Sequence, residues 1–226
     1  MPAIFLPIAR LRENHKRTLV RRTSDLVIEG YWRCGNHFAT YAFIQSQPRP
    51  VHVAHHFHAP AQLQLAARWG VPALLLVREP AAAVASATLY LEHDEPAPLL
   101  DFYNVFHSSL LAFRDRLVVS NFPRTIGDFA DVIREVNERF GRSYSLYQGT
   151  EEEEAQIRET IRREHRVNMD GNPATLPLPS ADKERRKQPI IARIESPENR
   201  PQLQKAQELY EAFVSVSARS RAACSC

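Results

Sequence analysis

The sequence predicts an α/β fold of three layers, in which helices flank a central, mostly parallel sheet. Three features support this class. Strand-like and helix-like runs alternate along the first half of the chain, an apolar run without interruption covers 71–77, and glycines follow two amphipathic segments at Gly70 and Gly141. Such alternation implies parallel strands joined by right-handed crossovers. A length of 226 residues suits one α/β domain with a sizeable core.

The first half provides three predicted strands, each followed by a helix. The strands are a buried run that enters a turn, an alternating segment, and the continuous apolar run typical of a central parallel strand. Proline at a first helical position and glycine after a last one mark two helix boundaries. In order, the elements are strand 25–30, helix 37–46, strand 51–57, helix 61–69, strand 71–77 and helix 81–90.

The second half is predicted to be more helical. One helix has its apolar residues on a single face, and another has acidic residues first and basic residues last, which suits the helix dipole. The segment 168–201 is rich in proline, serine and charge, and we expect a long loop there. The elements are helix 99–114, strand 117–121, helix 128–140, helix 151–166 and helix 201–218. The sheet core is expected to include Val27, Ile28, Val53, Leu74, Leu75 and Leu76.

The composition limits the classes of function. The net charge is +3, from 29 basic and 26 acidic residues, which is too balanced for a dedicated nucleic-acid-binding protein. Cys34 lies far from Cys224 and Cys226, so the cysteines predict no disulfide framework and a reducing, cytoplasmic compartment. The last two lack companion zinc ligands and are expected to be exposed thiols on a frayed end.

No segment has the length of a transmembrane helix, because the longest apolar stretch is far shorter than the roughly 20 residues required. The first 22 residues place an apolar run before a basic run, which is the reverse of a secretory signal. We expect this segment to form a packing helix, with a basic amphipathic segment on an acidic surface as the alternative.

The first candidate site follows the first predicted strand. Main-chain N–H groups and the positive end of a helix meet at such a junction and can bind a phosphate. Arg33 adds a fixed charge, Gly35 allows close backbone approach, and Asn36 and His37 place donors in the first helical turn. The lysine and serine or threonine of an ATP- or GTP-binding P-loop are missing. An ordinary strand-to-helix turn would also explain these residues.

The second candidate site follows the central strand. Arg78 stands at the carboxyl end of that strand, where open α/β sheets bind ligands. Ser86 lies about two helical turns further on, so its hydroxyl and the guanidinium can converge on one anion. As an alternative, Arg78 pairs with Glu79 and Ser86 fills a tight helix contact.

Four histidines cluster in and after the second predicted strand. A histidine there could deprotonate an acceptor hydroxyl, since its pKa lies near neutrality. In a strand, His52, His56 and His58 would share one face and His55 the other. Alternate histidines can form part of a zinc site, but no nearby carboxylate or cysteine completes one, so we expect no metal. Histidines that are only hydrogen-bonded beside a pocket are the alternative to a catalytic base.

Together these motifs resemble the sulfotransferases, which use 3′-phosphoadenosine 5′-phosphosulfate (PAPS) as donor. The first loop of that family has a Lys/Arg-Ser-Gly-Asn/Thr-Thr-aromatic pattern. The matching residues are Arg33, Cys34, Gly35, Asn36, His37 and Phe38. The family's second motif is Arg-Asn/Asp-Pro followed by a serine. Its matches are Arg78, Pro80 and Ser86. The resemblance covers about residues 22–141, with a fainter similarity over 180–187.

The resemblance implies a P-loop-like sulfotransferase fold over a single domain, 1–226, with a nucleotide-binding core at 22–141 and a helical and loop part at 142–226. It implies that the first motif holds the 5′-phosphosulfate and that the second holds the 3′-phosphate. The nearest basic cluster in the C-terminal part supplies Arg185 and Lys187 as further donor-binding residues. The placement of the family's base favours His56, with His55 and His58 close alternatives, and Arg33 would stabilise the leaving phosphate.

The resemblance therefore implies transfer of a sulfuryl group to a hydroxyl or amine of a small-molecule, glycan or lipid acceptor, without metal and without nucleic acid. Cys34, His37 and Ala82 depart from the family pattern. These departures favour an alternative, a catalytically inactive nucleotide-binding or interaction module of the same fold. A small-molecule kinase is a further alternative, which the missing P-loop lysine and magnesium ligand disfavour. The sequence specifies neither the acceptor nor the oligomeric state.

Overall fold

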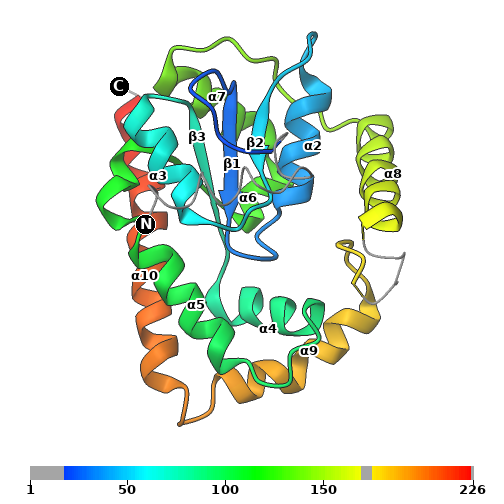
Figure 1. Cartoon of the computed structure of the whole chain (residues 1–226), viewed down its shortest axis with the longest axis vertical. Helices are drawn as coiled ribbons and strands as arrows, with labels where there is room; N and C mark the ends of the chain where they lie inside the picture. Colours follow the sequence, from blue (N-terminus) through cyan, green and yellow to red (C-terminus); the bar gives the residue numbers. More distant parts are fainter. Residues whose placement is uncertain (1–17, 169–174, 225–226) are drawn as a thin grey trace.

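The computed structural model describes residues 18–168 and 175–224, without the side chains of 168 and 216–224. Its centre is a parallel four-stranded sheet in the order β2-β1-β3-β4 (Figure 1). The expectations for the N-terminal segment and for the C-terminal thiols lie outside the residues and side chains described. The strands are β1 (Leu26–Gly30), β2 (Val53–His55), β3 (Ala73–Val77) and β4 (Val118–Asn121).

The strand register places the predicted core at the centre of the sheet. Ile28 of β1 pairs with His55 on one side and with Leu74 on the other, and Leu74 pairs with Val118. All six residues predicted for the core are buried. A sheet covered on both faces explains why β1 and β3 are apolar almost throughout rather than alternating. The α/β class predicted from the sequence is confirmed.

Helices cover both faces of the sheet. On one face α3 (Pro60–Trp69) and α10 (Arg200–Cys224) pack against the strands, and α5 (Ala97–Ser108) packs on α10. On the other face lie α2 (Asn36–Ser46), α6 (Phe122–Gly127) and α7 (Phe129–Phe140). No helix within 18–168 and 175–224 has both the length and the hydrophobicity to cross a membrane.

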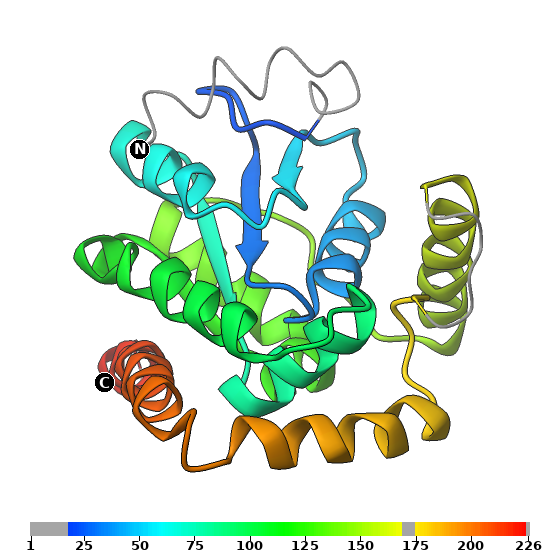
Figure 2. The ribbon, with the colours of Figure 1, turned by 60° about the horizontal axis from the view of Figure 1, so that its bottom comes forward.

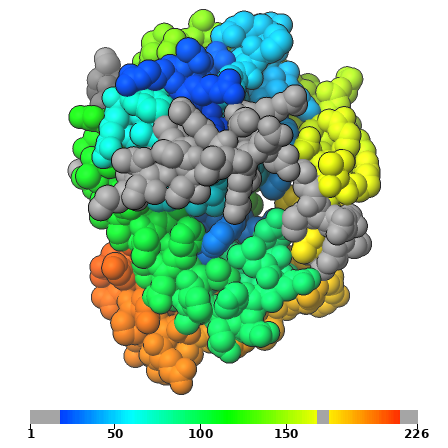
Figure 3. All heavy atoms as spheres, in the orientation of Figure 1, coloured from blue at the N-terminus to red at the C-terminus, as the bar shows by residue number. Residues whose placement is uncertain are grey.

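Three further helices extend beyond the two faces. α4 (Pro80–Tyr90) and α9 (Ala181–Ile194) pack together below the carboxyl ends of the strands, and α8 (Glu151–Asn168) packs beside α2 (Figures 1 and 2). In the space-filling view, atoms of α4 and α5 occupy the lower front of the molecule, with those of α10 at the lower left and those of α9 at the lower right (Figure 3). This lower region encloses the candidate site.

Several predicted boundaries are wrong. The single helix expected over 99–114 is α5 followed by the short 3-10 helix η2 (Leu111–Arg116), because the chain turns at Ser109 and Leu110. The strand expected over 51–57 ends at His55, since His56 has a left-handed φ of 60°. Helix α6 was not predicted, although Asn121 caps it by accepting a hydrogen bond from Arg124 N–H.

The long loop expected over 168–201 is also wrong, because α9 occupies most of its second half. Ser180 caps this helix by accepting a hydrogen bond from Lys183 N–H, and Asp182 and Glu184 lie in its first turn. These are ordinary N-terminal signals of a helix. Pro189 inside the helix argues against it by intrinsic propensity, and tertiary packing of Ile194 and its neighbours overrides that preference.

Candidate nucleotide-binding site

A cavity of about 440 Å³ lies at the carboxyl ends of β1 and β3, the edge at which open parallel sheets bind ligands. Its walls come from the loop after β1 and from α2, α4, α6, α8 and α9. The sequence-predicted residues that line it are Arg33, Gly35, Asn36, His37, Phe38, His58, Arg78, Ser86 and Lys187. The two motifs, far apart in sequence, therefore meet in one cavity.

The loop after β1 turns sharply into α2. Arg33 has a φ of 66° and Gly35 a φ of 94°, so the loop passes twice through the left-handed region. Asn36 braces the turn by donating from Nδ2 to the carbonyl of Tyr31 at 3.2 Å. Gly35 precedes α2 and has no side chain to cap the N–H groups of its first turn. That end of α2 faces the cavity and carries the positive end of the helix dipole, which suits an anion.

Two arginines, each in a segment that follows a different strand, lie together in this cavity. Arg33 donates from Nε to Ser86 Oγ at 3.2 Å, and its guanidinium lies 5.1 Å from the ring centre of Tyr90. Arg78 donates from Nη1 to the carbonyl of Arg33 at 3.0 Å. Burial lowers the pKa of Arg33 to about 10 and also lowers the pKa of Arg78, so Arg33 stays cationic at neutral pH. Neither arginine forms an ion pair with any residue that the structure describes.

The alternative pairing of Arg78 with Glu79 does not occur. The Glu79 carboxylate instead caps α4, accepting hydrogen bonds from Ala81 N–H at 3.0 Å and Ala82 N–H at 2.7 Å. Arg78 lies over the ring of Phe122, 4.1 Å from its centre. Cation–π contact holds the guanidinium in place without neutralising its charge.

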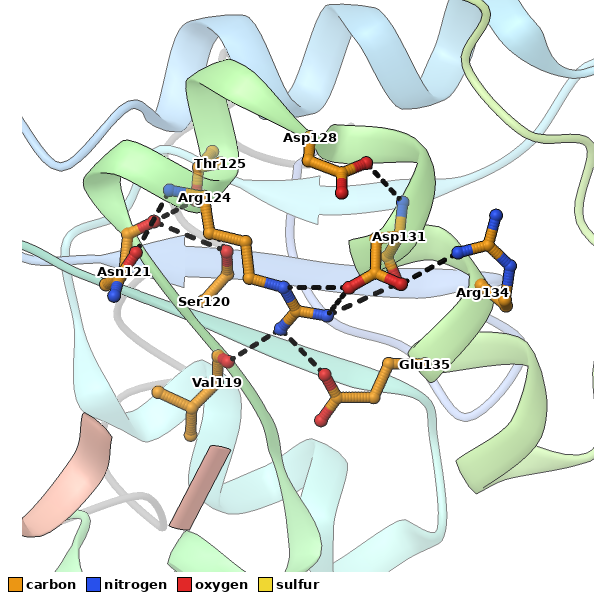
Figure 4. Close-up of polar contacts among 9 residues, drawn as sticks. All are labelled: Val119, Ser120, Asn121, Arg124, Thr125, Asp128, Asp131, Arg134 and Glu135. Carbon is orange, nitrogen blue, oxygen red and sulfur yellow. Dashed lines mark hydrogen bonds and ion pairs between the residues drawn. The ribbon is translucent and has the colours of Figure 1, made fainter. Parts of the chain in front are cut away.

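A buried arginine in turn fixes the helix that carries Phe122. Figure 4 shows Arg124 of α6 between two carboxylates of α7, Asp131 and Glu135. The distances are 2.8 Å from Nη2 to Asp131 Oδ2 and 2.7 Å from Nη1 to Glu135 Oε2. Only 9% of the Arg124 side chain is exposed, so these ion pairs are shielded from water. They fasten α6, and with it the aromatic ring under Arg78, to α7.

Cys34 does not reach the cavity through its side chain. The thiol is fully buried and points toward the carbonyl of Trp32, with a sulfur–oxygen distance of 3.7 Å. Burial raises the pKa of Cys34 to about 12, which keeps the thiol neutral. Any contribution of this position to a ligand must therefore come from its main chain.

The histidines divide between the cavity and the interior. His58 lines the cavity, and its Nδ1 lies 2.9 Å from the carbonyl oxygen of Gly30. A carbonyl only accepts, so Nδ1 carries the hydrogen and Nε2 keeps a free lone pair in the neutral ring. His56 and His55 are joined through their Nδ1 atoms at 2.5 Å and do not line the cavity. Burial lowers the pKa of His58 to about 4 and that of His37 to about 3.

The face assignment made for the histidines is wrong. It required an extended strand through residue 58, but His56 and His58 both have positive φ angles, 60° and 48°. The chain therefore leaves the period of two after His55. Within the described part of the chain, no group of three or more His, Cys, Asp or Glu residues could hold a metal.

The basic cluster of α9 contributes lysines to the cavity. Lys183 and Lys187 line it, whereas Arg185 does not. Lys187 pairs with Glu184 at 2.6 Å, and its side chain is only 8% exposed. Arg185 is largely exposed and pairs with Asp182 at 3.0 Å. On a helix, residues four apart share a face, so Lys183 and Lys187 turn inward together.

Among solved structures, the chain is similar to the crystal structure of mouse sulfotransferase SULT7A1 complexed with PAP. The match covers 90% of each chain, with a TM-score of 0.54 and 12% sequence identity. The chain has the sulfotransferase fold. No protein-family model and no curated protein sequence matches it.

Within this sulfotransferase fold, sequence reasoning missed several residues that line the cavity. Trp32 stacks on Phe102 with ring centres 4.7 Å apart and lies beside His58. Tyr90 and Phe122 lie over the two arginines. Trp32 directly precedes the first motif, and Phe122 directly follows the strand β4. Their positions in the sequence therefore indicated that they could line the cavity. Lys183 belongs to the basic cluster already singled out, and only the helical geometry of α9 distinguishes it from Arg185.

Proposed function

We propose that this chain binds PAPS in the cavity and transfers its sulfuryl group to a hydroxyl or amine acceptor. One observation carries the proposal. Arg33 and Arg78 are partly buried in one cavity, yet neither forms an ion pair with a residue of the described ranges. An unpaired buried cation is costly, and an anionic ligand would compensate it. A sulfotransferase of similar fold is complexed with PAP.

The cavity supports a division of the donor into two anionic ends. We assign the 3′-phosphate to Arg78 and Ser86, and the 5′-phosphosulfate to the loop 33–38 at the start of α2. Cys34 would take part only through its main chain, because its thiol is buried. Lys183 and Lys187 would add positive charge from α9, and Arg185 lies off the cavity.

We assign the base to His58 rather than His56, because among His55, His56 and His58 only His58 lines the cavity. Its Nε2 would take the proton of the acceptor hydroxyl as the acceptor oxygen attacks sulfur. The bond between sulfur and the bridging phosphate oxygen would break, and that oxygen would leave with its electron pair on adenosine 3′,5′-bisphosphate. Arg33 and the amides of α2 would stabilise the charge that develops there.

The acceptor would lie on the side of the cavity formed by His58 and Trp32. Apolar residues of α8 and of 177–179 form further wall, which suits a small molecule with an apolar body. Glycan and lipid acceptors remain within the proposal.

Binding and turnover test the proposal separately. Adenosine 3′,5′-bisphosphate should raise the melting temperature more than ATP with magnesium, because the proposed site binds two anionic groups without a metal. A ligand at 100 times its Kd adds about 2.7 kcal/mol to the free energy of unfolding. Transfer from sulfur-35-labelled PAPS to phenolic, alcoholic and amine acceptors should then yield labelled product. Equal or greater stabilisation by ATP with magnesium would contradict the donor assignment. Tight binding of the bisphosphate without transfer to any acceptor would select the inactive nucleotide-binding module.

A further inference from the structure

Glu29 is a fully buried carboxylate next to the candidate site. It is the fourth residue of β1, a strand that is paired on both sides. Across the described residues, no lysine, arginine or histidine forms an ion pair with it. A buried carboxylate without a cation must be satisfied by hydrogen bonds.

Three donors from outside β1 bind this carboxylate, and two of them belong to the segment after β2. Phe57 N–H donates to Oε1 at 2.8 Å, and His58 N–H donates to Oε2 at 3.0 Å. The third donor is Gln62 Nε2, 3.0 Å from Oε1. Gln62 is itself held by Val20 N–H, which donates to its Oε1 at 2.6 Å. The amide of Gln62 is therefore oriented so that its nitrogen faces Glu29.

The segment 56–58, which is hydrogen-bonded to Glu29, has an unusual backbone conformation. His56 and His58 have φ angles of 60° and 48°, which lie in the left-handed region that residues other than glycine seldom occupy. Such conformations persist where the surroundings impose them. Two successive N–H groups, of Phe57 and His58, donate to the two oxygens of one carboxyl group, and these hydrogen bonds supply that constraint.

The same segment presents His58 to the cavity. Its Nδ1 faces the carbonyl of Gly30, the residue after Glu29. Gly30 is held tightly against β3, since a Cβ at this position would lie 2.4 Å from the carbonyl oxygen of Leu76. The end of β1 therefore fixes His58 twice, through the Glu29 carboxylate on its main chain and through the Gly30 carbonyl on its ring.

We propose that Glu29 is a positioning residue, which holds the turn of residues 56–58 and thereby sets the direction and tautomer of His58 in the cavity. Glu29 does not line the cavity, so it acts through His58 and does not touch a ligand. The proposal rests on the proposed function only in giving His58 the role of base.

The test compares Glu29→Gln with Asp25→Asn. Asp25 precedes β1 and accepts a hydrogen bond from His52 N–H at 2.8 Å. His52 directly precedes β2, whereas the residues bound by Glu29 follow that strand. Each change therefore removes a carboxylate that binds the same stretch of chain. The full-length proteins carry isotope-labelled histidine, and long-range proton–nitrogen correlation spectra report the tautomer of each ring. His58→Gln identifies the signal of His58, and melting curves verify that each variant is folded.

In the parent protein and in Asp25→Asn, His58 should be in the Nδ1–H tautomer. In Glu29→Gln, an amide nitrogen meets an N–H group, and the ring should become a mixture of tautomers. The rate constant kcat should fall about 100-fold, the scale of a misplaced catalytic group, while the affinity for adenosine 3′,5′-bisphosphate stays unchanged. If Glu29→Gln does not fold, Glu29→Asp keeps the charge, retracts the oxygens and should give a smaller change of the same kind.

An unaltered His58 tautomer in a folded Glu29 variant would overturn the positioning role. The spectra need no turnover, so an inactive parent protein would contradict the proposed function and leave this test intact. Equal losses in Glu29→Gln and Asp25→Asn would also contradict the proposal, since they would indicate a general loss of structure.

Discussion

Arg33 Nε and Ser86 Oγ lie 3.2 Å apart, and this hydrogen bond joins the loop after β1 to the second turn of α4. The bond places the guanidinium that is assigned to the 5′-phosphosulfate beside the hydroxyl that is assigned to the 3′-phosphate. The serine oxygen accepts from a donor of the partly buried guanidinium, which satisfies that donor.

Replacing Ser86 with alanine tests this contact. Ser86→Ala should weaken binding of adenosine 3′,5′-bisphosphate by about 1 kcal/mol, the usual contribution of one hydrogen bond, with little loss of stability. Calorimetric titration measures the affinity. Ser46→Ala is the matched control, because that hydroxyl donates to the carbonyl of Phe43, accepts from Gln47 Nε2 and does not line the cavity. Unchanged affinity in Ser86→Ala would remove this hydroxyl from the assigned site.

The two arginines should differ in what their loss changes. Arg78→Ala should weaken bisphosphate binding by about 2–3 kcal/mol, the scale of a charge-assisted bond to phosphate. Arg33→Ala should lower the rate of transfer more than the affinity, because its charge is assigned to the bond that breaks. Lysine at either position should rescue only partly, since it cannot make a two-pronged contact.

Calorimetry, single-turnover kinetics and melting curves on the same samples separate these effects. Arg49→Ala is the control, an arginine paired with Asp25 outside the cavity. If both cavity variants bind the bisphosphate like the parent protein, the two-arginine site is wrong.

Asp131 pairs with one buried and one exposed arginine, which allows a direct comparison of the two environments. Arg124→Met should destabilise the protein by about 3–5 kcal/mol, because Asp131 and Glu135 are left beside a neutral side chain. Arg134→Met removes a guanidinium whose side chain is 51% exposed and should cost less than about 1 kcal/mol. Urea unfolding measures both. Similar losses would mean that burial does not strengthen the Arg124 pairs.

Stability should rise with pH between about 4 and 6.5. Burial lowers the pKa of His55, His58 and His107 to about 4, so these rings take up protons on unfolding in this window. Their contribution to stability is present above pH 6.5 and is lost as pH falls. Glu29 opposes them, because burial raises its pKa from 4.5 to about 7 and its contribution is lost as pH rises across that range.

Urea unfolding at pH 5 and pH 7 measures the net slope. Glu29→Gln removes the opposing contribution, so the rise between these values should be steeper in that variant. Parallel curves for the parent protein and Glu29→Gln would show that the carboxyl does not titrate in this window.

The sheet was predictable because strands that are buried on both faces consist of nearly continuous runs of apolar residues. Leu74, Leu75 and Leu76 belong to a short apolar run bounded by Gly70 and Pro80, which is typical of a central parallel strand. The convergence of Arg33, Arg78 and Ser86 followed from placing each at a strand end or helix face. These inferences needed only periodicity and the topology of parallel sheets.

The parts that were missed depend on conformation that residue type does not encode. The chain has left-handed φ angles at His56 and His58, and His58 rather than His56 lines the cavity; the sequence pattern alone did not predict this turn. Helix α9 was not predicted because it contains Pro189, so the position of Lys183 on the cavity was not predicted either. The interior position of Cys34 is likewise a property of the turn and not of the thiol.

The cavity has walls from both halves of the chain, since α8 and α9 close a space opened by β1, β3, α2 and α4. The contacts between these halves join residues far apart in sequence and carry a large loop-closure entropy. A nucleotide bound between the loop 33–38 and the lysines of α9 would link the two halves of the chain non-covalently. Its binding energy would then add to the docking of the C-terminal helices, so ligand occupancy and the completeness of the fold would be thermodynamically linked.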